Sequence, residues 1–171
     1  MIGFGQLTMI TDPNFEQKLI DLGYDNIIDG SVNTASIDTI TSLDINSSNI
    51  SDLAGIQDFT SLTSLSCYNN QLIGLDVSQN TFLEGLWCSD NQLTSIDVSG
   101  ATSLEWFDCT DNQLTNIDVS NNLLLDYLYI SNNNLTSLDI TNLYSFENLF
   151  ASNNQISSID LSSQTSFVPL F

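Results

Sequence analysis

A five-residue pattern recurs every 21 positions along most of this 171-residue chain. Its first uninterrupted copy consists of Leu62, Leu65, Cys67, Asn70 and Leu72. Four further copies follow at 21-residue steps, and one earlier copy begins at Ile40, 22 residues before Leu62. A unit this short cannot bury its own apolar face, so it must stack against its neighbours as the coils of a solenoid do. The pattern therefore predicts six stacked coils over residues 40–165.

The second half of each repeat echoes the first half. In the first full copy its apolar residues are Leu72, Leu75 and Val77, and the same spacing returns in every later copy. Because side chains alternate between the two faces of a strand, this spacing is typical of extended backbone with one buried face. We therefore expect a β-rich solenoid with parallel strands stacked every 21–22 residues and little or no convex helix.

Taken together, the residues L-x-x-L-x-[LC]-x-x-N-x-L resemble the signature of the leucine-rich-repeat family. The 21-residue form, with Cys in the strand and a Leu/Ile-Asp-Val tail, is similar to the short repeats of secreted and cell-surface proteins of Bacteroidetes. The resemblance covers nearly the whole chain and implies a leucine-rich-repeat solenoid used as a binding scaffold outside the cell. It does not identify the ligand, because this fold carries many binding functions.

A short helix is expected before the first coil, near residues 13–22. Asp12 can cap its start, Pro13 suits its first position and Gly23 can end it. Such a helix would cover the open end of the solenoid. The expected organisation is a signal-peptide remnant or frayed terminus at 1–5, an N-terminal cap at 6–39, six repeats at 40–165, and the start of a truncated further repeat at 166–171.

Charge narrows the possible partners and chemistries. The chain has 21 acidic residues, a net charge of −20, no histidine, and Lys18 as its single basic residue. This charge repels phosphate backbones and anionic lipid, and no apolar run reaches the roughly 18 residues of a membrane span. We therefore expect neither nucleic-acid binding nor membrane insertion. Without His or Arg, and with no carboxylate visibly enclosed in an apolar pocket, we do not expect an enzyme.

The three cysteines, Cys67, Cys88 and Cys109, occupy one inward position on consecutive coils. Ile130 and Ala151 take the same position in later coils, which indicates a small apolar slot. A metal site would lack a fourth ligand there, and we expect reduced, unreactive thiols. The Asn column that begins at Asn70 lies at the turn of each coil, where a stacked amide can satisfy buried backbone groups.

A second column is acidic and lies between inward apolar residues, so that it faces outward. It comprises Asp76, Asp97, Asp118, Asp139 and Asp160. Stacked coils would place these carboxylates about 4.8 Å apart. The column is either a calcium-binding edge or a hydrated, solubilising rail; a calcium loop of the D-x-D-x-D-G type is absent from the sequence. No other cofactor is expected. A flanking Ser/Thr column suggests ice binding only as a remote alternative.

The candidate ligand-binding residues are outward positions of the main strands. They are Tyr68, Trp87, Trp106, Asp108, Tyr127, Tyr129 and Phe150. Clustered outward aromatics are unusual on a soluble surface and dominate binding interfaces, although aromatic stacking along a sheet also stabilises neighbouring strands. We therefore expect a non-catalytic, secreted or cell-surface module that binds a protein or glycan. The alternative is a structural or adhesive spacer, with or without calcium stiffening along the Asp column.

Overall fold

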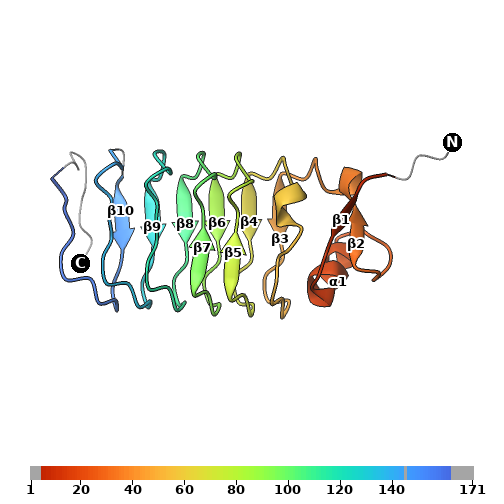
Figure 1. Ribbon diagram of the computed structural model, residues 1–171, viewed down its shortest axis with the longest axis horizontal. Coiled ribbons are helices and arrows are strands. Elements are labelled where there is room, and N and C mark those ends of the chain that lie inside the picture. Colours follow the sequence, from red (N-terminus) through yellow and green to blue (C-terminus); the bar gives the residue numbers. More distant parts are fainter. Residues whose placement is uncertain (1–4, 145, 163–171) are drawn as a thin grey trace.

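Stacking of the repeats produces an elongated solenoid, which the computed structural model describes for residues 5–144 and 146–162 (Figure 1). A parallel sheet of six strands, here termed the main sheet, follows the order β10-β9-β8-β6-β4-β3. Its strands are β3 (Ser42–Asp44), β4 (Ser64–Ser66), β6 (Gly85–Trp87), β8 (Trp106–Asp108), β9 (Tyr127–Tyr129) and β10 (Asn148–Phe150). Parallel strands stacked every 21–22 residues, as the repeat predicts, are confirmed.

The opposite side of the solenoid carries a shorter parallel pair, β5 (Gly74–Asp76) and β7 (Ser95–Asp97). Strand pairing on this side is confined to these two strands among the described residues, although the sequence pattern predicts extended segments there in every repeat. Within the described ranges, the helical content is α1 (Pro13–Asp21) and two short 3₁₀ turns, η1 (Thr34–Ser36) and η2 (Ile56–Asp58). The expectation of little convex helix is confirmed.

The core is a continuous column of the central residues of the main strands. Leu65, Leu86, Phe107 and Leu128 are buried, as the alternation of side chains in a strand requires. Their flanking residues therefore point away from the core, onto the outer face of the main sheet. Burying each such side chain stabilises the fold by roughly 1.5–3 kcal/mol, so the repeats hold together through apolar contact between neighbouring coils.

The Asn column connects adjacent coils at their turns. Asn112 donates its side-chain amide to the carbonyls of Cys88 and Cys109, at 3.0 and 3.1 Å. Its Oδ1 accepts the N–H of Leu93 at 2.9 Å. Asn70 and Asn133 make equivalent bonds, both to backbone groups of their own coil and to those of the preceding coil. Each amide therefore satisfies backbone groups in two coils that the packed turn shields from water.

The cysteine column lies wholly inside, and all three thiols are free. Burial raises the pKa of Cys67 to about 12 and also raises the pKa of Cys109, to which the nearby charge of Asp108 adds. The pKa of Cys88 is raised by burial first, and then by the neighbouring cysteines and Asp108. Since the thiolate is the reactive form, we expect these thiols to react slowly with electrophiles in the folded chain.

We expect Cys67, Cys88 and Cys109 to resist a thiol-specific reagent in the native protein and to react fully in denaturant. Each side chain is shielded from solvent, and its raised pKa keeps the thiolate scarce at neutral pH. A colorimetric thiol assay with and without denaturant measures this directly. Rapid labelling of the native protein would contradict the inward register of the column.

The N-terminal cap covers one end of the solenoid (Figure 1). It contains α1 (Pro13–Asp21) and an antiparallel pair, β1 (Leu7–Met9) and β2 (Ser31–Asn33). Asp12 Oδ1 accepts the N–H groups of Asn14 and Phe15 at the start of α1, while its Oδ2 accepts the N–H and the hydroxyl of Ser51. One carboxylate therefore caps the helix and ties it to the first repeat.

Glu16 provides a second anchor inside the cap. It is buried, with 1% of its surface exposed. Its Oε1 accepts the N–H groups of Asp29, Gly30 and Ser31 at 2.8–3.0 Å. A buried carboxylate that accepts three backbone hydrogen bonds fixes the loop leading into β2 against α1.

We expect Asp12→Asn to destabilise the protein by about 1–2 kcal/mol at neutral pH, and the difference to shrink in acid. Burial raises the pKa of Asp12, but hydrogen bonds from the hydroxyl and N–H of Ser51 and from the Phe15 and Asn14 amides together bring it below its ordinary value. A carboxyl with a lowered folded-state pKa contributes stability above its unfolded pKa, about 3.9, and loses it as pH falls through the folded pKa.

Urea unfolding of wild type and Asp12→Asn between neutral pH and about pH 2 tests this expectation. Asp21→Asn, at an exposed position of α1, is the control for loss of one negative charge. A stability difference between wild type and Asp12→Asn that does not change with pH would contradict the role given to the Asp12 carboxylate.

The two chain ends extend beyond the structural description. The start of a further repeat expected at 166–171 lies wholly outside the described residues, as does the signal-peptide remnant expected at 1–5 except for Gly5. The boundaries expected for the cap and for the six repeats stay predictions. Among the described residues, no helix combines the length and the apolar character needed to cross a membrane.

Candidate functional site

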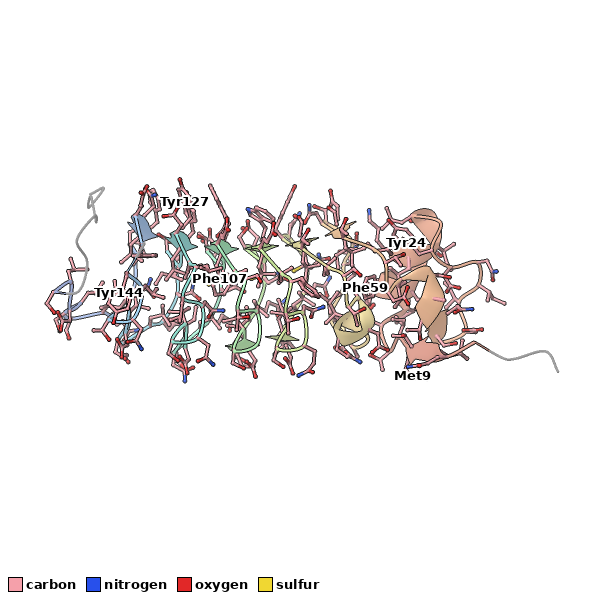
Figure 2. All side chains as sticks on the ribbon, turned by 90° about the horizontal axis from the view of Figure 1, so that it is seen from above. Met9, Tyr24, Phe59, Phe107, Tyr127 and Tyr144 are labelled. Carbon is pink, nitrogen blue, oxygen red and sulfur yellow. The ribbon has the colours of Figure 1, made fainter. Side chains whose placement is uncertain are left out.

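The outward residues of the main sheet form two columns that cross its strands. One column pairs Trp106 with Gly85 on one side and with Tyr127 on the other. The second column runs through Trp87, Asp108, Tyr129 and Phe150. Residues 21 positions apart are therefore paired on adjacent strands, as the period of the repeat requires: Trp87 with Asp108, Trp106 with Tyr127, and Tyr129 with Phe150. Figure 2 places Tyr127 at the outer surface, whereas Phe107 lies in the core.

Five rings from these columns stack into one continuous surface, termed here the aromatic ridge. Its members are Trp87, Trp106, Tyr127, Tyr129 and Phe150. Trp106 is central, with ring centroids 4.3 Å from Tyr127, 5.6 Å from Tyr129 and 6.4 Å from Trp87. Tyr129 and Phe150 stack nearly parallel at 4.6 Å. These distances are those of favourable aromatic pairs, and the mutual contact leaves every ring half-buried.

A glycine sets the position of Trp87 within the ridge. Trp87 lies two residues after Gly85 on β6, and its indole folds back over the glycine. A Cβ at Gly85 would meet the Trp87 ring at 2.4 Å, so a larger residue there would displace the indole. The absence of a side chain at Gly85 thus lets Trp87 lie over the sheet, toward Trp106. Gly85 was not among the residues that the sequence singled out.

Asp108 and Tyr68 differ in their relation to the ridge. Asp108 is half-buried between Trp87 and Tyr129, and its Oδ1 accepts the N–H of Thr110 at 2.9 Å. Burial raises the pKa of the Tyr129 hydroxyl, and the charge of Asp108 raises it further. Tyr68 lies beyond the end of β4 with 41% of its surface exposed, and within the described part of the chain no ring contact joins it to the ridge.

A row of carboxylates borders the ridge at the start of the main strands, and it is termed here the acidic row. It consists of Glu84, Glu105, Asp126 and Glu147. The carbonyls of Glu84, Glu105 and Asp126 each accept two N–H groups from the next coil. The 21-residue register of the main strands therefore extends to these positions and stacks the acidic residues at one edge of the sheet. The row recurs every 21 residues in the sequence but was not recognised there.

A shallow pocket of about 250 Å³ joins the acidic row to the aromatic ridge. Its lining residues include Glu84, Glu105, Asp126, Trp87, Trp106 and Tyr127. Flat π faces and carboxylates therefore converge on the same concave patch. Such a patch can stack against a planar or apolar group while accepting hydrogen bonds from donors beside it.

The outward Asp column predicted as a calcium edge lies on the other side of the solenoid. Asp76 and Asp97 are paired on β5 and β7, and they line a groove of about 620 Å³ with Asp52. Each Asp of the column accepts the N–H of the hydroxyl residue two positions later, at 2.9–3.0 Å. The described residues contain no cluster of three or more metal-ligating side chains.

These turn contacts also account for the charge state of the column. Hydrogen bonds from the Ser99 hydroxyl and N–H lower the pKa of Asp97, and equivalent bonds from the following Ser or Thr lower the pKa of Asp118, Asp139 and Asp160. All five carboxylates therefore stabilise local turns, and the lowered pKa values of these four favour their ionised form. Calcium binding by Asp76, Asp97, Asp118, Asp139 and Asp160 stays a prediction.

The calcium hypothesis predicts that millimolar calcium raises the melting temperature and that Asp97→Asn with Asp118→Asn abolishes the gain. Asn retains the side-chain oxygen that accepts the turn N–H, so this variant removes charge while keeping the turn. Thermal melts with calcium and with sodium chloride at matched ionic strength make the comparison. Equal stabilisation by both salts would leave only screening of like charges.

Known proteins with the same repeat architecture resemble this chain in sequence and in structure. The leucine-rich-repeat family model matches residues 124–149. Internalin J of Listeria monocytogenes serotype 4b (strain F2365) is 37% identical over 70 residues, which are 41% of this chain and 8% of that protein. The solved functional domain of InlJ from Listeria monocytogenes, described as including a cysteine ladder, aligns with a TM-score of 0.85 at 35% identity.

That alignment covers 98% of this chain and 38% of the InlJ domain, so the chain spans well under half of these relatives. The internalin inlF from Listeria monocytogenes strain 4b F2365 aligns at a TM-score of 0.78 and 18% identity, over 93% of this chain and 55% of that one, which supports the fold alone. Together with parallel strands stacked every 21–22 residues, these matches support the assignment of the chain to the leucine-rich-repeat family.

Proposed function

We propose that this chain is a non-catalytic recognition module that binds a protein or glycan ligand through the aromatic ridge. The observation that carries the proposal is the ridge itself, where five rings form one outward surface and both tryptophans of the chain take part. Trp and Tyr are enriched among the residues that dominate binding energies. Leucine-rich-repeat solenoids commonly bind proteins on the extended surfaces that their stacked repeats create.

Two further observations support the proposal. The ridge adjoins a concave pocket, so a ligand can contact several rings and carboxylates at once. The outward Asp residues of the other side act within local turns, and the sequence has no His or Arg to serve in acid-base or phosphate chemistry. We place the module outside the cell or at its surface, because its repeats resemble those of secreted and surface proteins.

The alternative, a spacer, also has a specific observation in its favour. The ridge rings stack on one another at 4.3–6.4 Å, and such pairs stabilise neighbouring strands without any ligand. A spacer would need these contacts for stability alone. The two functions differ in what removal of the rings does to binding.

Arrays of glycans and of recombinant cell-surface protein ectodomains, probed with the isolated chain, test the proposal. Trp87→Ala with Trp106→Ala should abolish each saturable signal that the wild type gives. Tyr144→Ala is the control, because Tyr144 is an exposed aromatic residue outside the ridge. Signals that survive in the double variant would contradict the proposal and leave the spacer.

A further inference from the structure

Carboxylates border the aromatic ridge on both sides. The acidic row lies at the start of the main strands, and three of its members line the ridge pocket. At the other end of these strands, Asp90 and Asp111 are exposed in the turns, each with a positive φ, while Asp108 lies between ridge rings. A ligand on the ridge would therefore have negative charge beside it at both ends of the main strands.

The sequence supplies no Lys or Arg side chain that could neutralise this charge at the ridge. Lys18 is the single Lys or Arg of the sequence, and it lies in α1 at the cap end of the solenoid (Figure 1). In the ridge pocket, Asp126 Oδ1 is buried and has no hydrogen-bond partner among the described residues. A buried carboxylate oxygen without a donor makes the negative charge of Asp126 costly, and a cation bound beside it would offset that cost.

We infer that the partner of the ridge is a protein segment carrying Lys or Arg side chains, which lies across the main strands. This inference rests on the proposed function and specifies its ligand. A guanidinium or ammonium group can stack on the indole of Trp106 while it donates to the exposed Glu84 or Glu105 at the pocket edge. A neutral glycan would stack on the rings but leave the carboxylates without countercharge.

The dimensions suit a short extended segment. Adjacent main strands are about 4.8 Å apart, so the four coils from Trp87 to Phe150 span about 14 Å, the length of roughly four extended residues. Each coil along that path contributes one carboxylate of the acidic row. A segment with several cationic side chains therefore finds an acceptor at every coil that it crosses.

The experiment uses a synthetic peptide of alternating Arg and Thr, and the same peptide with neutral citrulline in place of each Arg. Tryptophan fluorescence reports occupancy, because Trp87 and Trp106 are the two tryptophans of the chain and both lie in the ridge. Glu84→Gln with Glu105→Gln removes two charges of the acidic row. Asp97→Asn with Asp118→Asn removes the same charge on the opposite side and is the matched control.

The Arg peptide should change the fluorescence saturably at low salt, and the citrulline peptide should not. The acidic-row variant should weaken binding by roughly five- to tenfold, because each exposed ion pair contributes modestly, and added salt should weaken it further. The control variant should stay within about twofold. No saturable change with the Arg peptide, or equal weakening by both double variants, would overturn the inference.

The array experiment separates this inference from the proposed function. Neutral glycan signals that depend on Trp87 and Trp106, with no response to the Arg peptide, would keep the ridge as a binding face and overturn the cationic partner. Array signals that survive loss of both tryptophans would contradict the proposed function itself.

Discussion

Replacing Asn112 by Ala is expected to lower the free energy of unfolding by about 3 kcal/mol or more. The side chain is buried, and it bonds backbone groups of Cys88, Cys109 and Leu93 at 2.9–3.1 Å. Alanine would leave these donors and acceptors enclosed without partners, at roughly 1–3 kcal/mol each, and would open a small cavity between two coils. The effect should exceed that of removing any exposed side chain of the same coil.

Urea unfolding followed by circular dichroism measures this loss. Asn116→Ala is the matched control, because Asn116 is an exposed residue of the same repeat. Asn112→Asp offers a second comparison, since it keeps the acceptor for Leu93 N–H but places a carboxylate opposite the Cys88 and Cys109 carbonyls. A loss in Asn112→Ala as small as that in Asn116→Ala would contradict the structural role of the Asn column.

Replacing Trp106 by Ala is expected to cost at least about 2 kcal/mol of ligand binding, or roughly thirtyfold in affinity. Trp106 is the ring that joins Trp87 to Tyr127 and Tyr129, so its loss divides the ridge. The fold should lose about 1.5–2 kcal/mol, the lower end for three ring pairs, because the ring is half-buried and its stacking contacts lie outside the core. Loss of affinity in the folded protein distinguishes a binding face from strand stacking, which would change stability alone.

The sequence predicts most of the fold because its signal is periodic. A 21-residue step with alternating side chains determines both which residues face inward and which residues pair across strands. That is why the contacts of Trp106 with Tyr127 and of Tyr129 with Phe150 could be predicted before any coordinates. The cap helix could also be predicted from the sequence, because Asp12 and Pro13 are residues typical of a helix start.

Features that depend on tertiary contacts were harder to predict. From the sequence, Glu16 would be expected on the exposed surface of the helix. In the structure, the loop at Asp29–Ser31 folds back and donates three N–H groups to it. Asn80 and Asn122 are buried and donate to carbonyls of the preceding coil, but Ala101 occupies the equivalent position between them, so no column is visible. An interrupted pattern gives no periodic signal.

The candidate site was predicted in part for the same reason. The stacking of Trp106 on Tyr127 and of Tyr129 on Phe150 follows from the 21-residue register, whereas the contact of Trp87 with Trp106 depends on how Trp87 folds over Gly85. The acidic row does repeat every 21 residues, but the pocket that joins it to the ridge depends on tertiary packing, which the apolar pattern does not reveal. Tyr68 shares the outward register of the ridge but lies beyond the strand end, away from the stacked rings.

The central claim is that the aromatic ridge is a surface for binding rather than for stability. The most direct test measures ligand affinity and unfolding free energy in parallel on wild type, Trp106→Ala and the off-ridge control Tyr144→Ala. A ligand identified on the arrays serves for the affinity. We predict that Trp106→Ala weakens binding by roughly thirtyfold or more and destabilises the fold by about 1.5–2 kcal/mol. Tyr144→Ala should stay close to wild type in both measurements. Unchanged affinity in Trp106→Ala, together with a stability loss of several kcal/mol, would contradict the claim.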